Sequence, residues 1–392
     1  MSAGNTGGLM HVLTVVSVAA SREGAGNAER AVQLARALAR RGLQSTLLTL
    51  DIGDWRTRLA QLDGGRLIAL TCAQERFQVP VPCWSTLREL VREADVIQMV
   101  GYWSLLHVMV AMAARREGVP WVMCPAGALT VFGRSQWFKR IFNAAFGRRL
   151  VRDAAGWIAI THDEVEHFVA YDIPGECVEI FPNGVDEGDL AAMPAATFRS
   201  CFNLPPEPYL LFVGRLNLIK GPDLLLEAFS AIAGCHQGLH LVFAGPDDGM
   251  RDMLSARATA AGLAARVHFV GFVGGADKAA AYREAALLVV PSRSEAMSIV
   301  AVESGLCGTP VLMTNRCGLR ELDEVDASLT VPATVAGLVA GLDYALADPQ
   351  RLTSWGGRWR EIVRERFLWK DIAARLAGWL ATIARTERRP VA

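Results

Sequence analysis

The sequence predicts an α/β protein made of two parallel-sheet domains of nearly equal size. Short apolar runs alternate with amphipathic helical stretches along most of the 392 residues, a rhythm typical of parallel sheets covered by helices on both faces. The rhythm stops in an Ala- and Pro-rich stretch at 191–208 and then starts again. The length also exceeds the roughly 250–300 residues that one core normally holds. Ligands of such sheets bind beyond the carboxyl ends of the strands, so we expect the site in a cleft between the domains.

Each predicted strand is a short, mainly apolar run between turn residues and helical stretches. In the first domain we expect strands at 12–18, 45–50, 96–100, 121–124, 157–160 and 178–181. In the second domain we expect strands at 209–213, 241–244, 267–270, 286–290, 311–314 and 329–331. The helix predicted at 28–41 has one apolar stripe and ends at Gly42. The stretch 351–385 also has a helical pattern, with aromatic residues that we expect to pack against the core: Trp355, Trp359, Phe367 and Trp369.

Composition excludes several classes of protein. Hydrophobic residues make up 52% of the chain, which excludes a disordered polymer. The 40 Lys and Arg balance the 40 Asp and Glu, whereas a general nucleic-acid binder carries a basic excess, so we expect no nucleic-acid partner. The stretch 9–20 could be a short signal-peptide core, but no Lys or Arg precedes it, and a first buried strand is the better interpretation. Eight cysteines without a Cys-x-x-Cys pair favour a cytoplasmic protein.

The strand at 209–213 runs into a loop that carries two cations. Gly214 and Arg215 end the strand, and Lys220, Gly221 and Pro222 lead into a helix. Gly221 can cap this helix, with Pro222 as its first residue. A forked guanidinium, an ammonium and a helix N-terminus together suit a diphosphate. A pair of solvated surface charges is the alternative for this segment taken alone.

A second loop carries two glutamates. We expect Glu295 at the start of a helix and Glu303 two turns later, which separates them by about 12 Å along the axis. Carboxylates bind vicinal hydroxyls, so a glutamate at each end of a nucleotide sugar could hold the sugar and the ribose. The backbone N–H groups at the helix start would then face the phosphates: Met297, Ser298 and Ile299. Two exposed helix glutamates are the alternative.

These segments, taken in order, resemble those of the family 4 glycosyltransferases. That resemblance rests on the following motifs: Gly24-Ala25-Gly26-Asn27-Ala28-Glu29-Arg30, Pro182-Asn183-Gly184-Val185-Asp186, Gly214-Arg215 with Lys220-Gly221, Ala244-Gly245-Pro246, Val267-His268-Phe269-Val270-Gly271, Glu295 with Glu303, and Gly308-Thr309-Pro310-Val311. It implies the GT-B fold, in which two Rossmann-like domains face each other across a cleft and C-terminal helices cross back to the first domain. The domains would then be 1–195, a linker at 196–208, 209–365, and a crossing helix at 366–392.

The resemblance also implies a retaining transfer of sugar from a nucleotide diphosphate, with roles for single residues. Arg215 and Lys220 would stabilise the leaving diphosphate, Glu295 would contact the donor sugar, and Glu303 would hold the ribose. The residues assigned to donor binding besides these are Gly24, Gly26, Gly214, Phe272, Met297, Ser298 and Ile299. Gly24 to Gly26 would form a loop over the phosphates, and the backbone near Phe272 would meet the base.

The sequence departs from the family at three places. Met297 and Ser298 stand where Phe and Gly are common, and Ala126 lies where many members carry a His, so no proton can be transferred from that side chain. Gly24 to Gly26 lack the third glycine of a dinucleotide motif, which weakens an NAD interpretation. No Asp-x-Asp motif stands out, and with cations at the diphosphate we expect metal-independent transfer with no cofactor besides the donor substrate.

The acceptor side carries weaker signals. Gly127, Ala128 and Asn183 are the candidates there, and the acceptor could be a glycan, a lipid-linked molecule or a small molecule. A helix predicted at 135–153 combines five basic residues with aromatic ones. It either rests peripherally on the anionic inner face of a membrane or packs its apolar stripe inward and leaves its charges solvated.

Two other functions remain open at the level of sequence. A GT-B epimerase or hydrolase would act on the nucleotide sugar itself, and its acid–base groups could come only from Glu295 or from His162, Asp163 and Glu164. A nucleotide-sugar-binding protein without turnover would keep both cations and both glutamates. The Ala-, Arg- and Gly-rich composition suggests a bacterial source.

Overall fold

The computed structural model describes residues 9–130, 136–191, 197–326 and 329–386. Its contacts divide the chain into two compact units: unit 1 is 1–182 with 369–392, and unit 2 is 183–368. The chain therefore enters unit 2 after Pro182 and returns to unit 1 at Trp369. Residues 183–191, expected in the first domain, belong to unit 2 by their contacts.

Unit 1 contains a parallel sheet of seven strands in the order β3-β2-β1-β6-β7-β8-β9. Its strands are β1 (His11–Val18), β2 (Gln44–Leu50), β3 (Arg66–Leu70), β6 (Val96–Val100), β7 (Trp121–Cys124), β8 (Gly156–Ala159) and β9 (Val178–Ile180), with a small antiparallel pair of β4 (Cys72–Gln74) and β5 (Val79–Pro80). Its longer helices are α1 (Ser21–Arg40), α2 (Trp84–Glu93), α3 (Leu105–Glu117), α4 (Gln136–Phe142), α5 (Arg148–Arg152), α6 (His162–Val169) and α15 (Trp369–Thr386).

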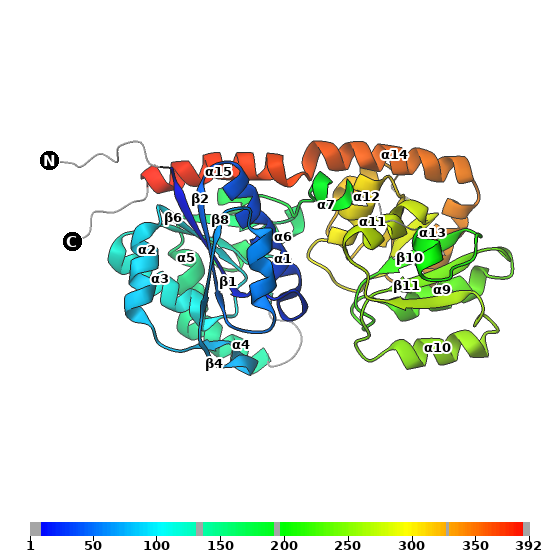
Figure 1. Cartoon of the computed structure of the whole chain (residues 1–392), viewed down its shortest axis with the longest axis horizontal. Helices are drawn as coiled ribbons and strands as arrows, with labels where there is room; N and C mark the ends of the chain where they lie inside the picture. The colour runs from blue at the N-terminus through cyan, green and yellow to red at the C-terminus, as the bar shows by residue number, and fades with distance from the viewer. Residues whose placement is uncertain (1–8, 131–135, 192–196, 327–328, 387–392) are drawn as a thin grey trace. The chain divides into compact units, whose positions relative to one another are not determined.

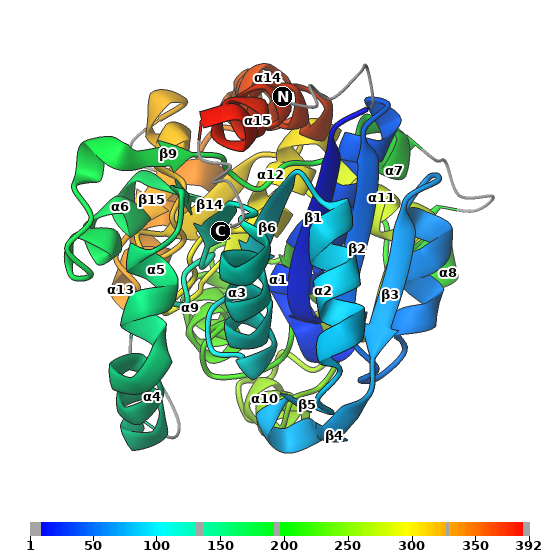
Figure 2. The same ribbon diagram turned by 90° about the vertical axis from the view of Figure 1, so that its left-hand side faces the viewer.

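Alternating residues of β1 build the cores on the two faces of this sheet. Leu13 and Val15 belong to a cluster packed with α2 and α3, whereas Val16 packs with α1 residues in a second cluster. Figure 2 shows α2 and α3 in front of the sheet and α1 behind it. Two covered faces explain why the central strands are mostly apolar and why nearly all of their residues are buried.

Unit 2 contains a parallel sheet of six strands in the order β12-β11-β10-β13-β14-β15. Its strands are β10 (Tyr209–Val213), β11 (His240–Ala244), β12 (Val267–Gly271), β13 (Leu287–Val290), β14 (Val311–Thr314) and β15 (Thr330–Val331). Its helices are α7 (Glu187–Ala191), α8 (Phe198–Cys201), α9 (Pro222–Ile232), α10 (Arg251–Ala260), α11 (Gly275–Glu284), α12 (Ile299–Cys307), α13 (Val335–Leu346) and α14 (Pro349–Arg366). The described residues also form short 3-10 helices: η1 (Trp55–Gln61), η2 (Glu75–Phe77), η4 (Gly175–Cys177) and η5 (Arg320–Glu324).

The predicted fold class is therefore confirmed, and the strand bounds agree with the expected ones to within one residue at most ends. Both sheets reverse their strand order next to their first strand, at β1–β6 and at β10–β13. Such switch points are where doubly wound sheets bind ligands.

The helical stretch expected at 351–385 is divided into two helices. They are α14 in unit 2 and α15 in unit 1, which Figure 1 shows as consecutive orange and red ribbons. The four aromatic residues are buried as predicted: Trp355, Trp359, Phe367 and Trp369. Within unit 1, α15 packs against α1 and β6, so the expected return of the C-terminal helix is confirmed.

Candidate functional site

The candidate donor site lies at the carboxyl edge of the unit 2 sheet. Because all six strands are parallel, the loops that follow them meet at one edge. Two of these loops flank the switch point: loop 214–221 follows β10 and loop 291–298 follows β13. They hold all three residues predicted to be catalytic: Arg215, Lys220 and Glu295.

Lys220 and Glu295 are brought together by these two loops. Lys220 Nζ lies 2.9 Å from Glu295 Oε1, and Ser292 Oγ also donates a hydrogen bond to the same carboxylate oxygen. The Glu295 side chain is only 8% exposed, and its backbone N–H donates to Arg316 O at 2.8 Å. The pair therefore presents one cation and one carboxylate at the switch point in a fixed geometry.

Arg215 lies in the same loop but has a different partner. Its Nη1 is 3.6 Å from Asp248 Oδ2, with both side chains about half exposed, and Asn217 Nδ2 donates to that same oxygen at 2.9 Å. An exposed pair of this kind contributes little to stability. The guanidinium can thus exchange Asp248 for a phosphate at small cost.

Glu303 is held by two side chains of α11 that the sequence analysis missed. Lys278 Nζ and Tyr282 Oη each lie 2.7 Å from one oxygen of its carboxylate. Burial and the nearby carboxylate raise the pKa of Tyr282 well above its usual value, so the phenol stays a donor. A Lys and a Tyr four residues apart share one face of a helix, which is a signal that the sequence did contain.

The expected spacing of the two glutamates is wrong. Helix α12 begins at Ile299, so Glu295 lies in the preceding loop and a helical rise does not relate it to Glu303. The N–H of Ser298 donates to Cys317 O at 3.0 Å, so this donor is already satisfied within the protein. The backbone N–H groups of Glu295 and Ser298 both donate to the loop after β14. Because these hydrogen bonds join segments that are distant in the sequence, the local pattern did not show where the helix begins.

The predicted helix start at Gly221 is confirmed. Gly221 caps α9 with φ of +69° and Pro222 is the first helical residue. A Cβ on Gly221 would lie 2.1 Å from Pro291 O, so this position admits no side chain. Gly245 is equally constrained, since its Cβ would lie 1.8 Å from Gly214 O.

Phe272 and Met297 differ in exposure. Phe272 follows β12 at the same edge and is 77% exposed, as a residue free to stack on a planar ligand would be. Met297 is buried, and its Sδ accepts the N–H of Asn183 at 3.2 Å. Asn183, predicted on the acceptor side of the first domain, thus belongs to unit 2 and contacts the donor loop.

In unit 1, the candidates Gly127 and Ala128 lie in the loop after β7 at the carboxyl edge of that sheet. The loop is fixed by Glu164, which is buried and accepts the N–H groups of Gly127 and Ile160. Burial raises the pKa of Glu164, although these hydrogen bonds oppose the shift. Its carboxylate therefore supports the loop and is not presented to a substrate.

The loop expected at Gly24 to Gly26 is wrong. Helix α1 begins at Ser21 and includes both glycines, only two residues after β1 ends. Each glycine costs a helix about 1 kcal/mol relative to alanine, but tertiary packing routinely overrides such propensities, and α1 packs against β1, β2 and α15. Arg30 of the same motif is buried and donates to Phe181 O and Pro182 O at 2.8 and 3.0 Å, so it fixes the end of unit 1.

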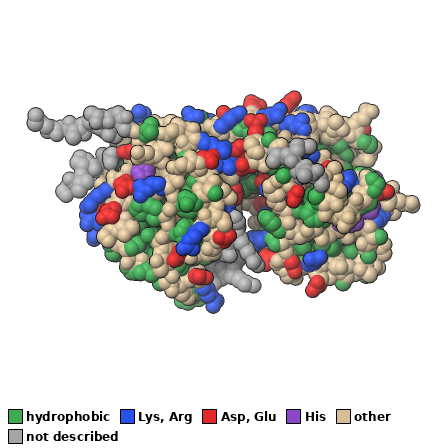
Figure 3. All heavy atoms as spheres, viewed as in Figure 1, with side chains coloured by type: hydrophobic (Ala, Val, Ile, Leu, Met, Phe, Trp, Pro, Cys, Tyr) green, Lys and Arg blue, Asp and Glu red, His purple; other side chains and the backbone are tan. Residues whose placement is uncertain are grey.

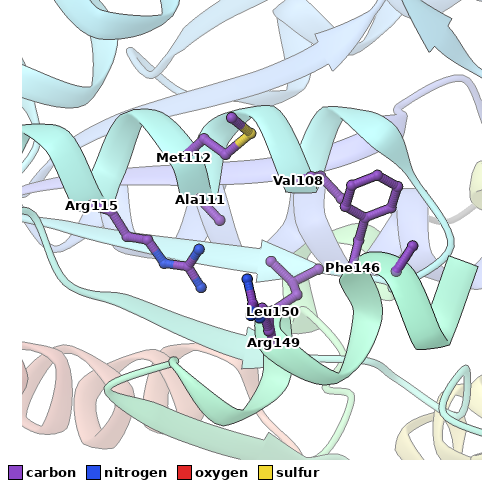
Figure 4. Close-up of a pocket in the computed structure, with 8 residues that line it drawn as sticks. Val108, Ala111, Met112, Arg115, Phe146, Arg149 and Leu150 are labelled. Atoms are coloured by element: carbon purple, nitrogen blue, oxygen red, sulfur yellow. The ribbon is translucent and has the colours of Figure 1, made fainter.

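A pocket of about 230 Å³ lies between α3 and the α4–α5 segment of unit 1. Figure 4 shows Arg115 and Arg149 at one end and Val108 and Phe146 at the other. The helix predicted at 135–153 is observed from Gln136 to Arg152 with a π-helical turn at Asn143–Gly147, and residue 135 lies outside the described residues. The turn occurs where Gly147 packs on Tyr102 Oη, 2.2 Å from an added Cβ.

Charges elsewhere are mixed. Figure 3 shows basic and acidic side chains interspersed over the visible face of both units. Within 9–130, 136–191, 197–326 and 329–386, no group of three or more His, Cys, Asp and Glu side chains could hold a metal ion. No helix of those same residues has the length and apolarity that crossing a membrane requires.

Two family models match the chain. The model described as glycosyl transferase 4-like domain matches 25–184, and the one described as glycosyl transferases group 1 matches 198–361. The chain belongs to the family 4 glycosyltransferases of the GT-B fold. The expectation of an enzyme that transfers sugar is thereby confirmed at the level of the family.

Curated relatives are similar over different lengths. A D-inositol 3-phosphate glycosyltransferase of Segniliparus rotundus is 32% identical over 53% of this chain, and the match spans about half (48%) of that relative. A protein of the same description from Frankia alni is 29% identical over 82% of each chain.

Solved structures confirm the fold. Anabaena HepE in complex with UDP-glucose has a TM-score of 0.76 at 21% identity and covers 95% of this chain and 100% of its own. A sucrose-phosphate synthase from Thermosynechococcus elongatus has a TM-score of 0.74 at 22% identity, with 95% and 99% covered. At these identities the likeness concerns the fold alone.

Proposed function

We propose that this glycosyltransferase moves a sugar from a nucleotide diphosphate to an acceptor, with retention of configuration and without a metal ion. The observation that carries the proposal is the Lys220–Glu295 pair at the switch point of the unit 2 sheet. A diphosphate would take Lys220 and Arg215 as counter-ions, and the cations would stabilise the charge that develops as it leaves. Glu295, freed from Lys220, would accept hydrogen bonds from the donor sugar.

The remaining donor contacts follow the same edge. Glu303 would bind the ribose and Phe272 would stack on the base. The N–H groups of Met297 and Ile299, beside the start of α12, would approach the phosphates, whereas that of Ser298 is bound to Cys317 O. Gly127 and Ala128 would meet the acceptor. The solved structure of HepE is described as a complex with UDP-glucose, and two relatives are named D-inositol 3-phosphate glycosyltransferases. A UDP-sugar as donor and a phosphorylated polyol as acceptor are therefore the first substrates to try.

The test is a melting-temperature screen with UDP-, GDP-, ADP- and dTDP-linked sugars, because a ligand of the native state raises the melting temperature. The sugar selected is then incubated with acceptors, and the anomeric configuration of the product is read by NMR. We expect the product to keep the anomeric configuration of the donor sugar. We also expect transfer to continue after EDTA treatment. An inverted product, or free sugar or an epimer formed without acceptor, would contradict the proposal.

We also propose that the protein is cytoplasmic and that unit 1 contacts anionic lipid peripherally through α4. The sequence left open whether the apolar residues of the predicted helix 135–153 pack inward. Three of them are exposed: Trp137 (60%) and Ile141 (52%) in α4, and Phe146 (45%) in the π-helical turn that follows it. Basic residues stand among them, and such a surface binds anionic headgroups. We expect the protein to sediment with phosphatidylglycerol vesicles and not with phosphatidylcholine vesicles, and sedimentation with neither would refute this contact.

A further inference from the structure

A third cation, Arg293, belongs to loop 291–298, and its side chain reaches loop 214–221. Its guanidinium forms a two-pronged pair with Asp223, with Nη1 2.8 Å from Oδ1 and Nη2 2.6 Å from Oδ2. The same Nη1 also donates to Leu218 O at 2.7 Å. Asp223 lies in the first turn of α9, so one side chain of loop 291–298 holds both loop 214–221 and the helix that follows it.

The electrostatics of this pair show that it is tight. The Asp223 side chain is 13% exposed. Burial alone would raise the pKa of Asp223, but the hydrogen bonds and charge of Arg293 outweigh it and hold this pKa below its usual value. The pKa of Arg293 is raised in turn by the hydrogen bond to Asp223. The charge of Arg293 is therefore neutralised within the protein.

The backbones of the two loops meet at neighbouring points. Arg293 N donates to Ile219 O at 2.7 Å, and Gly221 lies so close to Pro291 O that no Cβ fits. Lys220 stands between these two contacts, and its own N–H donates to Asn217 Oδ1 at 3.0 Å. The chain on either side of Lys220 is thus attached to loop 291–298, and its ammonium meets Glu295 of that same loop.

We infer that Arg293 is a positioning residue that sets the place of Lys220 relative to Glu295, and that it is not itself a ligand of the diphosphate. The inference rests on the proposed function, since it assigns Lys220 to the diphosphate. Its physical reason is that a planar fork can satisfy a carboxylate and a carbonyl together, which a lysine ammonium cannot do with the same geometry. A misplacement of about 1 Å at a reacting group can reduce the rate by about 100-fold.

The test compares two variants that separate positioning from direct binding. Arg293→Met removes the fork, whereas Asp223→Asn removes a negative charge close to an anion site and leaves Arg293 present. UDP affinity is measured by calorimetry together with the affinity for uridine, which has no phosphate. For a positioning role we expect both variants to weaken UDP binding by about 10- to 100-fold, the range for weakened hydrogen bonds to a charged ligand. Uridine affinity should stay unchanged, and Arg293→Lys should lose less UDP affinity than Arg293→Met.

The control is Arg257→Met, which breaks an exposed pair between α10 and Glu227 of α9, 2.6 Å apart; we expect no change in UDP affinity. If Arg293 bound the diphosphate directly, Asp223→Asn would strengthen UDP binding while Arg293→Met weakened it, and this result overturns the inference. Unchanged UDP affinity in both folded variants overturns it as well. If the unaltered protein bound no nucleoside diphosphate, the proposed function would fail and the inference with it, so the two failures are distinguishable.

Discussion

At the scale of the residue, the ribose assignment of Glu303 can be tested through the sugar of the nucleotide. One oxygen of its carboxylate accepts from Lys278 and the other from Tyr282, and each oxygen keeps a lone pair for a hydroxyl. We expect the native protein to bind UDP more tightly than 2′-deoxy-UDP. A hydrogen bond to a charged group contributes about 1.5–3 kcal/mol, so Glu303→Gln should reduce this preference to near unity in calorimetry.

Two further variants show whether the carboxylate itself is responsible. Tyr282→Phe keeps the charge of Glu303 and removes one of its anchors, so we expect the preference to shrink without disappearing. Glu361→Gln changes an exposed glutamate of α14 and should leave the preference intact. If Glu303→Gln discriminated between the two nucleotides as well as the native protein does, the ribose role would be refuted.

Sequence reasoning identified the residues that bear chemistry better than the residues that hold them. Lys220 and Glu295 were expected at one site, and the structure brings them into contact. The side chains that hold residues of this site come from segments distant in the sequence: Asp223 pairs with Arg293, and Lys278 pairs with Glu303. Such pairings depend on which loops and helices the fold brings together. The spacing of Lys278 and Tyr282 on one helix face is visible in the sequence, but their common partner Glu303 is not.

At the scale of the element, prediction succeeded where burial is complete. Strands β7, β10 and β14 lie inside their sheets and agree with the expected bounds at both ends. Strand β3 was missed although residues 67–70 are all apolar. It lies at the sheet edge with most of its residues only partly buried, and so short an apolar run does not by itself identify a strand. Strands β4 and β5 were missed because they are only three and two residues long and carry no apolar pattern.

Helix α3 carries a titratable group that should make the stability of unit 1 depend on pH. His107 is fully buried against β1, with Nε2 3.3 Å from Val15 O, and burial lowers its pKa from 6.5 to about 4. Between these values the unfolded chain binds a proton that the folded chain does not. The stabilisation is thus complete above pH 6.5 and is lost as the pH falls toward 4, by up to about 3 kcal/mol.

The measurement is urea unfolding at pH 7.5 and pH 5, in the native protein and in His107→Gln. We expect the variant to lose less unfolding free energy on acidification than the native protein, because its side chain does not titrate. His162→Gln changes an exposed histidine of α6 and should retain the native pH dependence. An equal loss in His107→Gln and in the native protein would show that His107 is not the group responsible.

At the scale of the whole molecule, unit 1 is built from two segments of the chain that unit 2 separates in the sequence. Residues 369–386 follow unit 2 in sequence, yet α15 packs on α1 and β6 of unit 1. Leu376 of this helix is fully buried, and Trp379 lies so close to Gly156 that an added Cβ would come within 2.6 Å of its ring. The core of unit 1 therefore lacks a part of its packing until α15 has been synthesised.

Leu376→Ala should accordingly destabilise unit 1 and spare unit 2, although unit 2 is nearer in sequence. A buried Leu→Ala change costs about 2–5 kcal/mol, and because each unit has its own core we expect two transitions in calorimetry. Leu226→Ala, at a buried position of α9 in unit 2, should lower the other transition. Thr382→Ala on the exposed face of α15 should shift neither. If Leu376→Ala and Leu226→Ala lowered the same transition, the C-terminal helix would not belong to a separately stable unit 1, and the two cores would have to be treated as one cooperative body.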